Sequence, residues 1–203
     1  MQKLRCTSCG ADLEVENQFI RSVTCAYCGA NYMISGSQTL DPKGKTATLA
    51  DYPSRLNVGA RGTIRGRAFH VLGRIRYTYD AGFWEEWQIA WDDEQSPPDW
   101  LEEDEGMWTL YRRGRIKAAI PPYEEVRVGT SISINQQNVF ITEKRKGQVA
   151  GSEGQFSSVF PISGEFGYVT GAGDKGKLSV NYWQDEIELS RGDEIEFNDL
   201  VIK

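Results

Sequence analysis

The sequence contains a single histidine, His70, and no apolar run long enough to span a bilayer. Residues 1–10 have no apolar stretch of the kind that a secretory signal requires. The lack of a membrane-spanning run and of a secretory signal predicts a cytoplasmic protein without membrane insertion. Positive charge is also scarce, because 23 Lys and Arg residues face 29 Asp and Glu residues, for a formal net charge of −6. Such an acidic balance disfavours binding to nucleic acid.

Cysteine is absent beyond residue 28, and all four cysteines lie in two Cys-x-x-Cys-Gly pairs: Cys6 and Cys9, then Cys25 and Cys28. In a reducing compartment, clustered thiols of this spacing favour a metal site over two disulfides or a redox pair. The pattern predicts a zinc ribbon that holds one Zn²⁺. Four thiolates fill the tetrahedron and leave no position for water, so the predicted zinc is structural and not catalytic.

The chain divides by composition into three parts. Residues 1–34 form the predicted ribbon, and residues 35–53 are small and polar with two prolines, which is typical of a linker. Residues 54–203 form the predicted all-β domain. Because the linker offers few apolar residues to join the two parts, we expect residues 54–203 to fold without the ribbon.

Apolar residues of the larger part alternate with polar ones, as in the segments 68–79, 87–91, 126–134 and 177–182. Period two, interrupted by Gly-rich turns such as residues 191–193, predicts an antiparallel β-barrel or β-sandwich. Residues 56–74 also align without a gap on residues 126–144, at an offset of 70. This alignment has two possible explanations: a pseudo-duplication of two β halves, or the alternation of apolar and polar residues that any two strand pairs share.

Residues 71–77, Trp84-x-Glu86-Trp87, Trp100-Leu101 and Gly106-x-Trp108 resemble the bacterial domain-of-unknown-function 4178 family. The resemblance covers most of residues 54–203 and is most specific in their middle third. Members of that family often carry an N-terminal zinc ribbon and tend to be encoded near polyamine-synthesis enzymes and membrane-stress proteins. The resemblance therefore implies a bacterial cytosolic protein and brings no established activity.

Charge is segregated along the chain. Six arginines and no carboxylate lie between Ser54 and Tyr79, whereas eleven carboxylates and no lysine or arginine lie between Asp80 and Glu105. One reading pairs the two segments as neighbouring strands, with arginines opposite acids. Eleven acids exceed six arginines, however, so we expect an exposed acidic loop between Trp91 and Trp108. Its acids and tryptophans could hold a cation, or the tryptophans could be core residues and the acids only solvate the loop.

The candidate partner-binding residues are Glu86, Trp100, Glu102, Glu103, Asp104 and Trp108. Glu86 lies between two tryptophans and would have a raised pKa if it were buried, which makes it the best single candidate for a general base. No nucleophile accompanies it, and His70 has no evident partner, so no catalytic residue is assigned.

These observations favour a non-catalytic binding or scaffold protein with a structural zinc ribbon and a protein partner, which could be cationic. The first alternative is a β-barrel enzyme or binder acting on a small cation such as a polyamine. The second is a nucleic-acid-binding module, which the acidic charge disfavours.

Overall fold

The computed structural model describes residues 2–35, 40–50, 53–93, 95–159 and 164–203. Parts of the expected linker, residues 36–39 and 51–52, and Glu94 of the acidic segment lie outside the described residues. The described residues form strands and two short 3-10 turns, as the period-two pattern predicts. No helix among them has the length and apolar character to cross a membrane.

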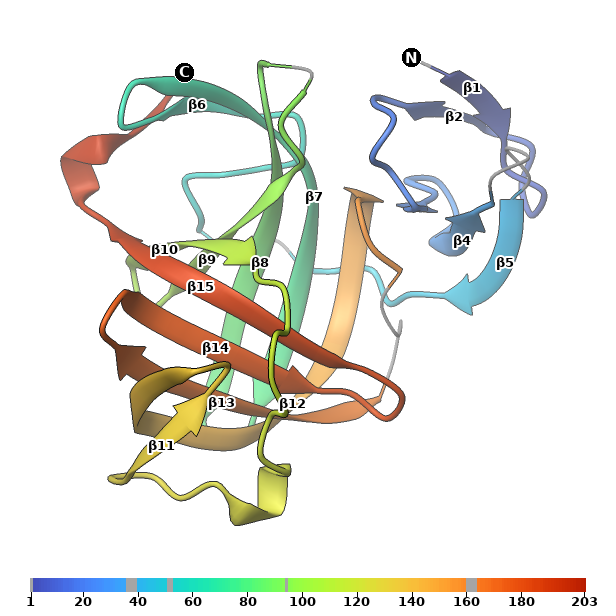
Figure 1. The fold of residues 1–203 in the computed structure, drawn as a ribbon. Coiled ribbons are helices and arrows are strands. Elements are labelled where there is room, and N and C mark those ends of the chain that lie inside the picture. Colours follow the sequence, from blue (N-terminus) through green and yellow to red (C-terminus); the bar gives the residue numbers. More distant parts are fainter. Residues whose placement is uncertain (1, 36–39, 51–52, 94, 160–163) are drawn as a thin grey trace.

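Eight antiparallel strands close into a barrel, in the order β7-β8-β9-β10-β15-β14-β13-β12, with β12 pairing back onto β7 (Figure 1). Of the two predicted architectures, the barrel is therefore the correct one. Its strands are β7 (Arg67–Tyr79), β8 (Gly82–Trp91), β9 (Asp99–Asp104), β10 (Met107–Arg113), β12 (Gln137–Phe156), β13 (Glu165–Gly173), β14 (Gly176–Tyr182) and β15 (Ile187–Ile195).

Shorter elements flank the barrel. The N-terminal strands are β1 (Gln2–Arg5), β2 (Asp12–Val15), β3 (Ser22–Thr24), β4 (Ala30–Ile34) and β5 (Leu40–Lys45). The others are β6 (Arg61–Ile64), β11 (Ser131–Ile134), β16 (Leu200–Ile202) and the 3-10 turns η1 (Tyr123–Glu125) and η2 (Phe197–Asp199).

The barrel consists of two similar halves, each with a short strand followed by four barrel strands: β6 to β10 and β11 to β15. Backbone details repeat at the offset of 70 seen in the sequence. The Gly59 amide donates to Val71 O at 2.9 Å, and the Gly129 amide donates to Ile141 O at 2.9 Å. The hairpin turns at 65–66 and 135–136 both use left-handed backbone. This correspondence supports the pseudo-duplication over a mere shared rhythm.

One face of the strands points into the barrel, and contacts between strands that are not neighbours identify it. The Trp84 ring on β8 lies 5.1 Å from the Tyr168 ring on β13, and Lys177 on β14 lies 3.3 Å from Glu102 on β9. Such contacts across the barrel require the sheet to curve around these side chains.

The aliphatic residues of the barrel lie mostly on its outer face, in two clusters covered by the flanking elements. One cluster is centred on Trp87, Ile89 and Leu101 and includes Leu200 of β16. The other joins β12, β13, β14 and β15 to Ile134 of β11. Because apolar packing occurs on the covered outside, polar side chains can line much of the interior.

The N-terminal strands lie on one side of the barrel and are hydrogen-bonded to it (Figure 1). Strand β3 pairs with residues 154–156 of β12, and Val15 and Ile20 pack against Leu72 and Ala90 of the barrel. The expectation that few apolar residues join the two parts is therefore wrong. The independent folding of residues 54–203 stays a prediction.

Two further expectations need correction. Residues 35–53 are not linker throughout, because Leu40–Lys45 forms β5 and pairs with β4. Gly192 is not in a hairpin turn but inside β15, opposite Tyr111. A Cβ at Gly192 would lie 2.7 Å from Tyr111 Cε1, so this glycine allows close approach of an aromatic ring.

Candidate functional site: a cysteine cluster and an acidic barrel interior

The four cysteines meet at one point, with their sulfur atoms within 4.8 Å of one another. Cys6 Sγ lies 3.7 Å from Cys28 Sγ, and Cys9 Sγ lies 3.7 Å from Cys25 Sγ. Tetrahedral zinc with Zn–S bonds of about 2.3 Å separates its sulfurs by about 3.8 Å. The thiols therefore fit a tetrahedral metal ion and are far too distant for disulfides.

Two matching turns hold these sulfurs. The Gly10 amide donates to Cys6 O and the Gly29 amide to Cys25 O, both at 2.9 Å. Both glycines have positive φ, 79° and 69°, which is the backbone that Gly adopts at little cost. Since the chain supplies all four ligands, this site has no open position for a substrate.

The central strands of the barrel place two pairs of carboxylates directly opposite each other. In the β8–β9 register, Glu85 faces Glu103 and Glu86 faces Glu102. Successive residues of a strand point to opposite faces, so the first pair is outside the barrel and the second is inside. Like charges directly opposite are destabilising unless a cation or a proton relieves them.

The two acids of the inner pair differ in how their negative charge is offset. Lys177 Nζ lies 3.3 Å from Glu102, whereas Glu86 accepts a hydrogen bond from Trp84 Nε1 at 3.3 Å. Burial, and then the negative charge of Glu102, raise the pKa of Glu86 to about 8. The expectation of a raised pKa at Glu86 is thereby confirmed, and at pH 7 its carboxyl group is mostly protonated.

Glu86 lines a cavity of about 40 Å³ inside the barrel. The wall of this cavity combines two further charged groups, hydroxyls and aromatic rings; it includes Tyr77, Trp100, Tyr111, Arg113, Asn181 and Glu188. Glu188 accepts hydrogen bonds from Trp183 Nε1 at 3.0 Å and pairs with Arg113 at 2.7 Å. Burial raises the pKa of Tyr77 and of Tyr111 well above the usual range, so both hydroxyls stay neutral.

Acids outnumber bases on the inner face. Among the described residues, strand alternation places six carboxylates there, Glu86, Glu102, Asp104, Glu143, Glu188 and Glu194, and three bases, Arg113, Arg145 and Lys177. Asp104 ends β9, and burial followed by the charges of Glu105 and Glu143 raises its pKa. The interior therefore favours a positively charged group.

The structure separates the candidate residues chosen from the sequence. The expected acidic loop is wrong, because residues 99–104 and 107–113 form β9 and β10. Glu86, Trp100 and Glu102 share the inner face, whereas Glu103 lies outside. Trp108 is a buried core residue, so the alternative that tryptophans of this segment belong to the core is confirmed for this side chain.

The sequence analysis missed Tyr77, Tyr111, Lys177 and Glu188, which the topology brings to Glu86 from four other strands. The alternation in residues 187–190 is a signal that Glu188 and Ser190 share a face, but it does not show that this face is internal. The pairing of arginines with neighbouring acids is confirmed, as in Arg67–Asp93 and Arg76–Glu85. His70 has an acid partner after all, because its Nε2 lies 2.8 Å from Glu16 Oε2.

The fold and the site together define an eight-stranded antiparallel barrel that carries a four-cysteine metal-binding segment. The profile of a domain of unknown function, DUF4178, matches residues 57–197, and the chain belongs to this family. The match spans both halves of the barrel. Neither the curated proteins nor the solved structures gave a match to this chain.

Proposed function

We propose that this protein is a non-catalytic binding protein whose barrel interior holds the ammonium group of a small organic cation. The observation that carries the proposal is the cavity at Glu86, an acid deep in the barrel that no basic side chain pairs with among the described residues. A bound ammonium would take the place of the proton that Glu86 retains at neutral pH.

The cavity chemistry favours an ammonium group over a metal ion. Apart from the cysteines, no set of three ligand atoms from His, Cys, Asp or Glu converges for a metal among the described residues. Separated acceptors suit an ammonium, which has three N–H donors pointing in different directions. The rings of Tyr77, Trp100 and Tyr111 add faces that attract a cation.

The cavity size supports binding of one head group and not of a whole polyamine. A water-sized sphere occupies about 10–15 Å³, so a cavity of about 40 Å³ has room for one small head group. The terminal ammonium of a primary amine, including that of a polyamine, meets this limit. The same limit disfavours the enzyme reading, since two reactants need more room.

We further propose that the ion at the cysteine cluster is zinc and that its role is structural, in the cytosol of a bacterium. Thiolate ligands and a tetrahedral arrangement suit zinc, and the hydrogen-bonded contact of β3 with β12 gives the ribbon a structural task. The nucleic-acid reading loses support because acids already pair with arginines of the segment 54–79.

The test is calorimetric titration of the intact protein with methylammonium, putrescine and spermidine at pH 6, 7, 8 and 9. With a pKa of about 8 at Glu86, ionisation of this residue should raise the affinity about tenfold from pH 6 to 7, about fivefold from 7 to 8 and less than twofold from 8 to 9. Binding at pH 7 should release a proton, seen as a dependence of the heat on the buffer.

Glu86→Gln should abolish this pH dependence, and Glu125→Gln on the exposed turn η1 is the matched control. Tetramethylammonium, which has no N–H donor and exceeds the cavity, should not bind. If no amine binds, or if Glu86→Gln binds amines as the natural protein does, the proposal is wrong.

A further inference from the structure

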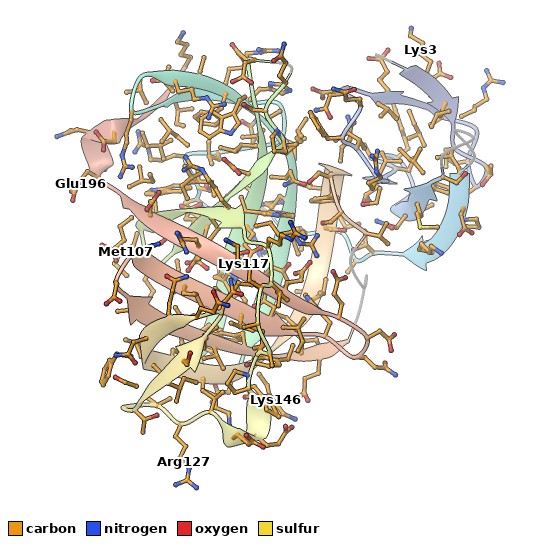
Figure 2. All side chains as sticks on the ribbon, in the orientation of Figure 1. Lys3, Met107, Lys117, Arg127, Lys146 and Glu196 are labelled. Atoms are coloured by element: carbon orange, nitrogen blue, oxygen red, sulfur yellow. The ribbon has the colours of Figure 1, made fainter. Side chains whose placement is uncertain are left out.

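The outer carboxylate pair belongs to a second, separate pocket at the rim of the barrel. This surface pocket, of about 350 Å³, lies at the tips of the β7–β8 and β9–β10 hairpins. Its wall consists of three acids, two aromatic rings and small residues: Tyr79, Ala81, Gly82, Phe83, Glu85, Glu103, Glu105, Gly106 and Pro53. Met107, which follows Gly106, projects from the left side of the barrel in Figure 2 and is 68% exposed.

A buried acceptor without a partner distinguishes this pocket from an ordinary acidic surface. The Glu85 side chain is 2% exposed, and its Oε1 atom binds Arg76 and Arg74. Its Oε2 atom is buried and has no hydrogen-bond partner among the described residues. An unsatisfied buried acceptor is destabilising, and a donor that reached this oxygen would relieve it.

The other two acids add acceptors at different depths. Glu103 is half-buried and accepts a hydrogen bond from Ser54 Oγ through one oxygen. Glu105 is exposed at the hairpin turn with a left-handed φ of 48°, an uncommon conformation for a residue with a side chain. Burial raises the pKa of Glu103, and the nearby base Arg55 opposes this rise. The Arg55 guanidinium donates to Leu200 O and lies 4.7 Å from the Phe197 ring.

Contacts within the chain show which cation binds where carboxylates lie beside aromatic rings. Arg76 donates to Glu85 Oε1 and places its guanidinium 4.8 Å from the centre of the Phe83 ring. The guanidinium of Arg145 likewise lies 5.3 Å from the Tyr79 ring. A carboxylate oxygen beside an aromatic ring therefore already binds one guanidinium group at the edge of this pocket, that of Arg76.

We propose that this outer pocket binds an arginine side chain of a partner protein, with Glu85, Glu103 and Glu105 as acceptors. A planar guanidinium has five N–H donors and can serve the deep Glu85 oxygen and the shallower acids together. A lysine ammonium lacks the planar face that packs on an aromatic ring. The proposal concerns the outer face and is independent of amine binding inside the barrel.

The experiment is an NMR titration of the ¹⁵N-labelled full chain with the peptide acetyl-Gly-Arg-Gly-amide. The Gly82 and Gly106 amides should show saturable shifts, because both glycines line the pocket. The lysine peptide should bind at least threefold more weakly, and the citrulline peptide, which keeps the shape without the charge, at least tenfold more weakly.

The variants avoid Glu85, because its loss would leave Arg74 and Arg76 unpaired and endanger the fold. The double variant Glu103→Gln, Glu105→Gln keeps the side-chain shapes and should weaken the arginine peptide at least tenfold. Glu86→Gln, on the inner face, and Glu125→Gln, remote on η1, should not change its affinity. Absence of saturable shifts at Gly82 and Gly106, full affinity in the double variant, or equal binding of all three peptides would overturn the proposal.

Discussion

Replacing Glu86 with glutamine should make the protein more stable at high pH and leave its stability at low pH unchanged. Glutamine has the size and polarity of a protonated glutamate, but it never carries a charge. The folded protein raises the pKa of Glu86 from about 4.5 to about 8 because the carboxylate form is buried beside Glu102. The unfolded chain has no such effect.

The sign follows from proton linkage. Between pH 4.5 and 8 the folded state holds a proton on Glu86 that the unfolded state has lost, so unfolding becomes easier as the pH rises. The cost is absent below about pH 4.5, reaches about 3 kcal/mol at pH 7 and levels off near 5 kcal/mol above pH 8, at about 1.4 kcal/mol per pH unit.

The assay is urea denaturation of the natural protein, Glu86→Gln and the control Glu125→Gln at unit steps from pH 5 to 9. Other acids with raised pKa values, such as Glu102 and Asp99, titrate in all three proteins, so the difference between the natural protein and Glu86→Gln isolates Glu86. That difference should grow by several kcal/mol across the range. A difference that stays constant with pH would refute the assignment of a buried, uncompensated Glu86.

Two further predictions concern the ribbon and its junction with the barrel. Elemental analysis should find one zinc ion per chain, and Cys25→Ser should lose this ion because one of the four thiol ligands is gone. The loss should unfold the ribbon, since structural zinc contributes about 10–16 kcal/mol of coupled folding free energy in such peptides. Iron, or no metal, in the natural protein would contradict this prediction. Gly154→Ala should destabilise the fold by about 3 kcal/mol or more, since φ is +86° and a Cβ would lie 2.3 Å from Leu72 O. Gly59→Ala has a similar φ of +87° but open space, so thermal unfolding should show a loss of only about 1–2 kcal/mol, and equal losses would argue against crowding at Gly154.

The local chemistry of this protein could be predicted from its sequence. Cys-x-x-Cys-Gly spacing specifies a metal-binding turn whatever surrounds it, and period two specifies strands. The repeat offset of 70 relates two hairpin turns, at residues 65–66 and 135–136, that have the same left-handed backbone. These features depend on residues that are close along the chain.

The barrel interior could not be predicted, since period two does not tell which face becomes internal. In this barrel the aliphatic face, with Trp87 and Ile89, is outside under β6 and β16, and the face with Glu86 is inside. The usual rule that apolar residues face the barrel core gives the opposite answer. The pairing of β12 with β7 closes the barrel and determines which face of the strands is internal. Bulges interrupt the pairing of these strands at residues 71–73 and 149–151, and the sequence indicates them only through glycines.

The two proposals assign a different cation to each of two neighbouring carboxylate pairs on strands β8 and β9. Since strand residues alternate, the dipeptide 85–86 on β8 and the dipeptide 102–103 on β9 must place one repelling pair on each face.

On the outside, Arg74 and Arg76 offset the charge of Glu85 but leave one of its oxygens without a donor among the described residues. On the inside, Lys177 offsets Glu102, and a proton on Glu86 does the rest. Among the described residues, Glu85 of the outer pair therefore lacks a donor at one oxygen, and Glu86 of the inner pair lacks a paired base, so the proposals assign a guanidinium to the first and an ammonium to the second. Because the two faces are relieved by different groups, Glu86→Gln should affect amine binding alone and the double variant at 103 and 105 peptide binding alone.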